Sequence, residues 1–279
     1  MTNERRSPWA AGLLSLVIPG LGHVYNGEPG LGLLAYLSQP VLFAFGNILF
    51  FATFPGTVAV LTLLLALYLG IAVHAALRAR RLGEVSLRWY NHVAVYLLVG
   101  VGVSILGGLT FKHVVLPALR YRTFQTAAAS MEPSLQIGDH FIVDTWAYRK
   151  QPPQRGDLIV FRFPNDPARD FVKRCVAVSG DVVAIHDKQL SIDGQPVAEP
   201  YVTHVDPEVL HDTGLSPVAV RDQYGPEKIP PGSCFSLGDN RDNSYDSRFY
   251  GSVRPDLLEA KALYVYWSKN GSRMGRRLR

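Results

Sequence analysis

The chain has 279 residues, of which 48% are hydrophobic and 18% charged, and its formal net charge is +5. This charged fraction lies below the roughly 25% typical of soluble domains, and long apolar stretches dominate the first 119 residues. These features exclude a chain that is water-soluble throughout. They predict a membrane region over residues 1–119 and a soluble domain over residues 120–279, which is long enough to bury a core of its own.

The placement of charge disfavours two classes of function. The arginines stand in short runs, such as those at residues 78–81 and 273–279, and not on a broad face interleaved with aromatic residues, so the sequence predicts no nucleic-acid partner. No charged residue falls in the middle of a long apolar stretch. A transporter or pump would be expected to place some there.

Apolar segments in the first part of the chain predict membrane helices. Three are long enough to span a membrane, over residues 30–54, 56–77 and 93–116. A fourth segment, residues 9–25, is at the short limit for a span and is interrupted by Pro19-Gly20. We therefore expect three spans and a fourth segment of a different kind.

Loop charge and the number of spans predict the orientation. The loop between the second and third spans contains Arg78, Arg80, Arg81 and Arg88, which is typical of a cytoplasmic loop. The N-terminus carries Arg5 and Arg6 and should lie on the same side. Both can be cytoplasmic only if residues 9–25 dip into the membrane and return or lie at its surface, so we predict a re-entrant or interfacial segment. The third span then leads to a soluble domain on the extracytoplasmic side.

The soluble part contains short segments rich in Val, Ile, Phe and Tyr, bounded by Gly, Pro or Asp, which predict strands. They cover residues 141–143, 158–163, 171–178, 182–185, 234–237 and 263–267. Residues 190–197 predict a hairpin in which Asp193-Gly194 suits a type I′ turn. No long amphipathic helix follows residue 120, so the predicted fold is an N-terminal multi-span α-helical membrane region followed by a mainly β domain.

Residues 198–231 are rich in Pro, Asp and His and are predicted to be an excursion from the β core. This segment contains the potential metal ligands His204, Asp206, His211 and Asp212. Their spacing matches no familiar ligand pattern, so we predict a solvated loop and no metal site.

The chain has two cysteines, Cys175 and Cys234, which are too few for a disulfide scaffold. They could pair if the soluble domain lies in an oxidising compartment. The alternative is that they are two small buried residues on strands. The sequence leaves both readings open.

A serine and a lysine provide the candidate chemistry. A serine hydroxyl is a poor nucleophile until a base removes its proton, and a lysine can be that base if burial lowers its pKa from about 10.4 by several units. Lys173 shares one face of a predicted strand with the apolar Phe171 and Cys175, so an amine pointing to that side must be neutral or paired. Taken alone, Ser130 is also typical of a turn or helix cap, and Lys173 of a strand edge. Arg174 points to the opposite face, where we expect it to stay solvated.

Four motifs together resemble the type I signal peptidases, a family of membrane-anchored proteases that use a Ser/Lys dyad. They are SMEPSL from Ser130, RGDLIVFRFP from Arg155, FVKRCVAVSGD from Phe171 and GDNRDNSYDSRFYG from Gly238. They occur in the family's order, and the similarity extends from Phe124 to Trp267. The resemblance implies the family's β fold for the soluble domain.

The resemblance also implies a role for each matching residue. Ser130 would attack the scissile carbonyl, and Lys173 would accept its proton and later return one to the leaving amine. Ser244 would orient the lysine amine, and Asp246 and Arg248 would form a supporting ion pair. The backbone N–H of Ser130 would be one oxyanion donor.

Some site assignments stay open. Many members of the family place a serine two residues before the nucleophile as second oxyanion donor, but this chain has Ala128 there, so that donor is unidentified. Motif position suggests Phe124, Thr126, Met131 and Val172 as residues of the substrate pocket. Plain core packing is the alternative for these side chains.

Substrate, partners and location follow from the same resemblance. The family cuts signal peptides from translocated preproteins after a small residue, at A-x-A type sites, through an acyl-enzyme, and it needs no cofactor. The expected location is the bacterial cytoplasmic membrane, with lipid as a partner and the secretion translocon as a further candidate. Phe141, Trp146 and Tyr148 are candidates for a patch that touches the membrane.

Two other functions remain as alternatives. A self-cleaving regulator of the repressor type uses a similar Ser/Lys pair, but three membrane spans argue against it. A membrane scaffold whose outer β domain has lost activity is the other, because Ala128 removes one expected donor. The presence of Ser130, Lys173 and Ser244 together argues against the scaffold.

Overall fold

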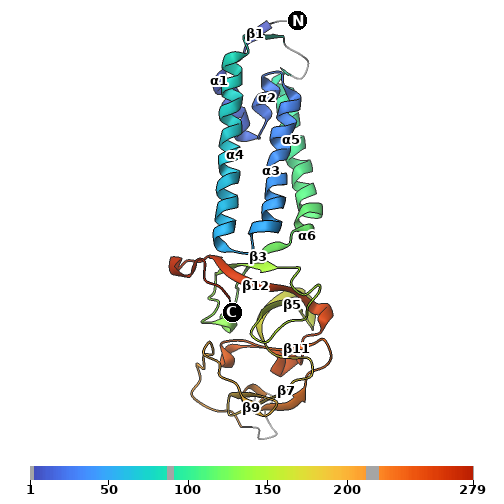
Figure 1. Cartoon of the computed structure of the whole chain (residues 1–279), viewed down its shortest axis with the longest axis vertical. Helices are drawn as coiled ribbons and strands as arrows, with labels where there is room; N and C mark the ends of the chain where they lie inside the picture. Colours follow the sequence, from blue (N-terminus) through green and yellow to red (C-terminus); the bar gives the residue numbers. More distant parts are fainter. Residues whose placement is uncertain (1–2, 87–90, 212–219, 279) are drawn as a thin grey trace. The chain divides into compact units, whose positions relative to one another are not determined.

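The computed structural model describes residues 3–86, 91–211 and 220–278. Arg88 and Asp212, which were assigned above to a cytoplasmic loop and to the excursion, lie outside the described residues. The chain forms two compact units, Met1–Leu119 and Arg120–Arg279. The first is helical and the second is built mainly of strands (Figure 1). The prediction of a helical region followed by a mainly β domain is therefore confirmed.

Three helices of the first unit are long and apolar enough to cross a membrane: α3 (Pro29–Phe50), α4 (Phe54–Arg81) and the stretch from Ala94 to His113, which contains most of α5 (Val93–Thr110). After α5 the chain continues through a π-helical turn, Phe111–Val115, and the short α6 (Leu116–Ala118). Most apolar side chains of these helices are exposed in the isolated chain. Such surfaces suit contact with lipid.

The ends of the first two long helices differ from the predicted boundaries for local reasons. Helix α3 stops at Phe50, because Thr53 caps a new helix by accepting a hydrogen bond from the N–H of Gly56 at 3.2 Å. Helix α4 runs past its apolar stretch to Arg81, with three arginines in its last turn. Cationic side chains there complement the partial negative charge of the helix C-terminus.

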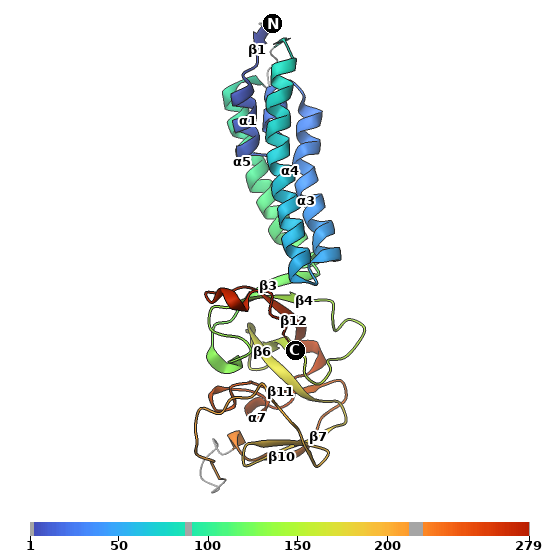
Figure 2. The ribbon, with the colours of Figure 1, turned by 60° about the vertical axis from the view of Figure 1, so that its left-hand side comes forward.

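The segment before α3 forms two short helices, α1 (Pro8–Val17) and α2 (Leu21–Tyr25). Neither has the roughly 20 residues needed to span a membrane. The chain reverses between them at Gly20, whose φ is +91° and whose Cβ, if present, would lie 2.1 Å from the carbonyl oxygen of Gly32. Helix α1 packs against α4, as Figures 1 and 2 show.

A small antiparallel sheet ties the N-terminus to the segment after α4. Strand β1 (Asn3–Arg5) pairs with β2 (Glu84–Ser86), so that Glu4 lies opposite Val85. The N-terminal arginines and the segment that follows α4 therefore lie at the same end of this unit. This pairing supports the prediction from loop charge that the N-terminus and the segment after α4 lie on the same side of the membrane.

The second unit contains two antiparallel sheets. The larger has the order β11-β6-β5-β12-β4-β3, with β3 (Tyr121–Gln125), β4 (His140–Asp144), β5 (Leu158–Phe163), β6 (Asp166–Val178), β11 (Cys234–Leu237) and β12 (Leu258–Trp267). The smaller has the order β10-β7-β8-β9, with β7 (Val182–His186), β8 (Gln189–Ile192), β9 (Gln195–Pro196) and β10 (Tyr224–Lys228). Asp193 and Gly194 both have positive φ between β8 and β9, as a type I′ turn requires.

The core of the second unit corrects one prediction about its surface. Phe141 on β4 is 1% exposed and lies in a cluster with Leu135, Val143 and Val160, so it does not contribute to a membrane-facing patch. It pairs across the sheet with Phe124 on β3, and the centroids of the two stacked rings lie 6.1 Å apart. Trp146 and Tyr148 are half-buried.

Both cysteines are free and completely buried. Cys175 on β6 and Cys234 on β11 belong to one apolar cluster with Ile159 and Phe161. In the structure both side chains pack against the apolar side chains of this cluster.

Candidate active site

Ser130 lies in a short 3-10 turn, Ala129–Met131, that follows strand β3. The side chain of Met131 is completely buried in the core and anchors the turn from below. Asn240 holds the turn from the other side. Its backbone N–H donates to the carbonyl oxygen of Ser130 at 3.1 Å, and its Nδ2 donates to that of Ala129 at 3.3 Å.

Lys173 reaches Ser130 from strand β6. Its Nζ lies 2.5 Å from Ser130 Oγ, well within hydrogen-bond distance. The lysine is only 4% exposed, and burial lowers the pKa of its amine to about 8, while the charge of Asp246 acts in the opposite direction. An appreciable fraction of the amine is therefore neutral near neutral pH and able to accept a proton.

Arg174, the next residue on β6, is also buried, so the expectation that it stays solvated is wrong. It is 1% exposed and forms a two-pronged ion pair with Asp239, with Nε–Oδ1 at 2.8 Å and Nη2–Oδ2 at 2.7 Å. Its remaining donors reach Ser134 Oγ at 3.2 Å and the carbonyl oxygen of Gly156 at 3.0 Å. The charge can be buried because the GDNRDNS motif supplies the matching carboxylate.

Asp246 and Arg248 form a second buried ion pair beside the lysine. Arg248 donates to both carboxylate oxygens of Asp246 at 2.8 Å. Burial alone would raise the pKa of Asp246, but the Arg248 charge, the hydrogen bonds from Arg248 and from the Gly238 N–H, and the nearby Ser244 hydroxyl outweigh it, so the pKa is lowered. Asp246 therefore stays ionised and contributes a negative charge near the Lys173 amine.

Ser244 is buried in the same region. Its Oγ lies close enough to Asp246 to help lower the pKa of that carboxyl. Among the described residues no hydrogen bond of standard geometry joins Ser244 Oγ to another group, including Lys173 Nζ. The orienting role suggested for Ser244 stays a prediction.

Gly238 is a site residue that the sequence analysis did not single out. A Cβ at this position would lie 2.4 Å from the carbonyl oxygen of Ser130 and 2.3 Å from Ser244 Oγ. Its N–H donates to Asp246 Oδ2 at 3.0 Å. Only a residue without a side chain fits between these groups, and its position at the start of the GDNRDNS motif was the available signal.

The suggested pocket residues differ in how much of each side chain is exposed. Phe124 and Val172 are half-buried and pack against the first core cluster, so part of each side chain remains available. Thr126 is buried, and within the described part of the chain its Oγ1 has no hydrogen-bond partner. Met131 offers no surface in this structure, because it is fully buried beneath the turn. Ala128 is exposed.

The excursion contains ion pairs. Asp206 pairs with Arg221 at 2.9 Å, and His204 Nδ1 lies 3.3 Å from Asp242. Within residues 3–86, 91–211 and 220–278, no three His, Cys, Asp or Glu side chains converge in a way that could hold a metal ion.

Comparisons with known proteins match this part of the chain. The family model described as "Signal peptidase, peptidase S26" matches residues 98–267. Signal peptidase I of Leptolyngbya laminosa is 36% identical over 169 residues, which cover 56% of this chain and 76% of the relative. Signal peptidase I of Pseudomonas fluorescens is 35% identical over 192 residues, covering 58% and 67%.

A solved structure is also similar. It is a signal peptidase I from Enterococcus faecalis V583, 29% identical, which matches over 40% of this chain and 97% of the solved chain with a TM-score of 0.32. The family match begins within α5. Helices α1 to α4 therefore lie outside it.

The close packing at Gly238 gives a testable prediction. Gly238→Ala should push the Ser130 turn or Ser244 away from its position, and a displacement of about 1 Å near reacting groups can cost roughly 100-fold in rate. We expect the rate of peptide-bond cleavage to fall by about that factor. The matched control is Gly271→Ala, whose Cβ would meet only the end of Met274 at 3.8 Å. Equal rates for the two variants would contradict the prediction.

Proposed function

Since this chain belongs to the signal peptidase family, peptidase S26, we propose that it removes signal peptides from translocated preproteins with Ser130 as nucleophile and Lys173 as general base. The observation that carries the proposal is the 2.5 Å separation between Ser130 Oγ and Lys173 Nζ. The lowered pKa of about 8 supports the role of the amine as a base at physiological pH.

The proposed reaction proceeds through an acyl-enzyme. The neutral amine of Lys173 takes the proton of the Ser130 hydroxyl as Oγ attacks the scissile carbonyl. The protonated amine then donates that proton to the leaving nitrogen, and the peptide bond breaks to leave an ester on Ser130. In the second half, Lys173 accepts a proton from water as the water oxygen attacks the ester carbon. The bond between that carbon and Ser130 Oγ then breaks, the new C-terminal carboxyl group is released, and the protonated amine returns its proton to Oγ.

Backbone and pocket groups would complete the site. The backbone N–H of Ser130 is the proposed first oxyanion donor, and a donor of this kind is typically worth about 3–4 kcal/mol to the transition state. Strand β3 is the outermost strand of its sheet and leads directly into the Ser130 turn. This supports binding of the substrate as an added strand. The partly exposed Phe124 and Val172 would then favour small side chains before the cut, as at an A-x-A type site.

The dyad predicts the behaviour of two variants. Ser130→Ala and Lys173→Ala should each lower cleavage of a preprotein in detergent by at least about 10³-fold, because loss of either member of such a unit removes the activated nucleophile. The exposed Ser179 and Lys150 of the same unit provide matched controls, Ser179→Ala and Lys150→Ala, which should cleave normally. Near-normal turnover by either dyad variant would refute the mechanism, and a wild-type chain that cuts nothing would favour an inactive scaffold.

The pH dependence of cleavage follows from the lysine. Its folded pKa of about 8 lies below the ordinary value of 10.5, so the reactive neutral form is lost as the pH falls through about 8. We expect kcat/KM to drop about tenfold per pH unit on the acidic side of that value. A profile that stayed flat from pH 8 down to pH 6 would show that the lysine is not the base.

We also propose that the second unit lies on the extracytoplasmic side of a bacterial membrane, where it meets lipid and translocated chains near the secretion translocon. Asn165→Cys in the second unit and Arg80→Cys at the end of α4 place thiols at exposed positions, and the two native cysteines are buried. In spheroplasts an impermeant maleimide should label the Asn165→Cys variant at once and the Arg80→Cys variant only after lysis. The reverse pattern would invert the proposed topology.

A further inference from the structure

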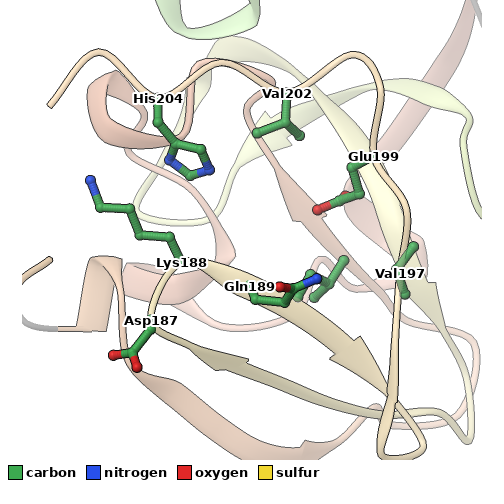
Figure 3. Close-up of a pocket in the computed structure, with 8 residues that line it drawn as sticks. Asp187, Lys188, Gln189, Val197, Glu199, Val202 and His204 are labelled. Atoms are coloured by element: carbon green, nitrogen blue, oxygen red, sulfur yellow. The ribbon is translucent and has the colours of Figure 1, made fainter. Parts of the chain in front are cut away.

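Residues 199–203, called the strap here, cross the second unit between β9 and the ion pairs of the excursion. A cavity of about 360 Å³ lies between the strap and the β7–β8 hairpin. Glu199 and Val202 of the strap line it together with Gln189 and Leu190 of β8. Figure 3 shows Glu199 and Val202 on one side of this cavity and Gln189 on the other. Other contacts must therefore hold the strap in place.

The first contact is an ion pair between Glu199 and Arg241. Arg241 donates from Nη1 at 2.8 Å and from Nη2 at 2.6 Å to the two carboxylate oxygens. The side chains are 8% and 3% exposed, so the pair is shielded from solvent. Arg241 Nε also donates to the carbonyl oxygen of Gly238 at 3.0 Å. Glu199 thereby fixes the glycine that packs against the backbone of Ser130.

The second contact reaches the strand that carries the base. The Arg174 guanidinium lies 3.8 Å from the centre of the Tyr201 ring. The Tyr201 hydroxyl donates to Glu199 Oε1 at 3.0 Å, and burial raises the pKa of this hydroxyl, so that it stays a donor. Because Arg174 follows Lys173 directly on β6, the ring fixes the strand next to the base.

The third contact is made by the backbone of Thr203. Its N–H donates to the carbonyl oxygen of Asp239 at 2.8 Å, and its own carbonyl oxygen accepts from the N–H of Arg241 at 3.0 Å. These two bonds bracket Asn240, the residue that holds the carbonyl groups of Ala129 and Ser130. The strap thus contacts both residues 238–241, which hold the turn that carries the nucleophile, and the strand that carries the base.

We propose that Tyr201 and Glu199 are positioning residues that hold Ser130 and Lys173 at reacting distance from each other. This inference rests on the proposed dyad. Neither residue touches the reacting atoms; they act through Arg174 and Arg241. A separation of 2.5 Å between Oγ and Nζ tolerates little movement, because a displacement of about 1 Å can cost roughly 100-fold in rate.

The test compares two substitutions at one position in the full-length chain in detergent, with a preprotein as substrate. Tyr201→Ala removes the ring from Arg174 and should lower kcat by about 10- to 100-fold with KM changed less than about twofold. Tyr201→Phe keeps the ring and should retain kcat within about threefold. Val205→Ala, at a 62% exposed residue of the same excursion, is the control and should behave as wild type.

A pH profile separates positioning from a general loss of folded protein. If loss of the ring from Arg174 lets strand β6 shift, the Lys173 amine loses part of its shelter and the acidic limb for Tyr201→Ala should move to higher pH, whereas a smaller folded fraction would lower the rate equally at all pH values. Normal kcat for Tyr201→Ala, an unmoved limb, or equal losses for the Ala and Phe variants would overturn the inference. If Tyr201→Ala does not fold, Glu199→Gln takes its place in the test. The inference then predicts the same loss of kcat at constant KM for this variant, and a normal kcat would overturn it.

Ser130→Ala, measured alongside, keeps the two hypotheses apart. Activity in that variant would refute the dyad itself. Activity that is lost in Ser130→Ala but normal in Tyr201→Ala would refute only the role of the strap.

Discussion

The site depends on keeping one amine uncharged beside one hydroxyl. Lowering the pKa of Lys173 from 10.5 to about 8 disfavours its charged form by about 3 kcal/mol. Burial achieves this, and the ionised Asp246 limits it, since its negative charge raises the pKa again. A deeper burial without that carboxylate would make the amine a weaker base, and an exposed lysine would stay protonated. The balance leaves an amine that can accept a proton near neutral pH.

The two faces of β6 each carry one buried basic residue, and the two residues differ in their carboxylate partners. Lys173 has no carboxylate within ion-pair distance among the described residues, whereas Arg174 has Asp239. Buried ion pairs of this kind add little net stability, yet removing one partner typically costs about 3–5 kcal/mol. Such a pair therefore acts mainly to fix geometry. The motif that begins at Gly238 supplies both Asp239 and Asp246, so one segment of chain sets the environment of the base on both sides of its strand.

The sequence predicted the fold class and most strands, because periodicity and turn residues indicate them. The proximity of Ser130 and Lys173 was predicted only through the resemblance of the motifs to a known family, and the two groups lie 2.5 Å apart. Prediction from the sequence failed where a contact depends on residues far apart in the chain. Arg174 alternates to the face opposite Lys173, which favours solvent by pattern alone, but Asp239 meets it from 65 residues away. Phe141 is aromatic and near the nucleophile, and only its register opposite Phe124 shows that it belongs to the core. Gly238 begins a motif that the sequence shows, but only the atoms around it explain why a side chain does not fit there.

The first unit raises a further constraint, because the family match does not include α1 to α4. In a bilayer, polar groups must find partners inside the protein, and the short α1–α2 hairpin brings several. His23 and His74 hydrogen-bond at 2.8 Å, Asn26 Nδ2 donates to the carbonyl oxygen of Ala75 at 2.8 Å, and Glu28 pairs with Arg78. Each bond joins the segment before α3 to α4. Because His23 and Asn26 are buried, breaking their bonds would leave polar groups without partners, so the hairpin and α4 should behave as one body and not as independent segments.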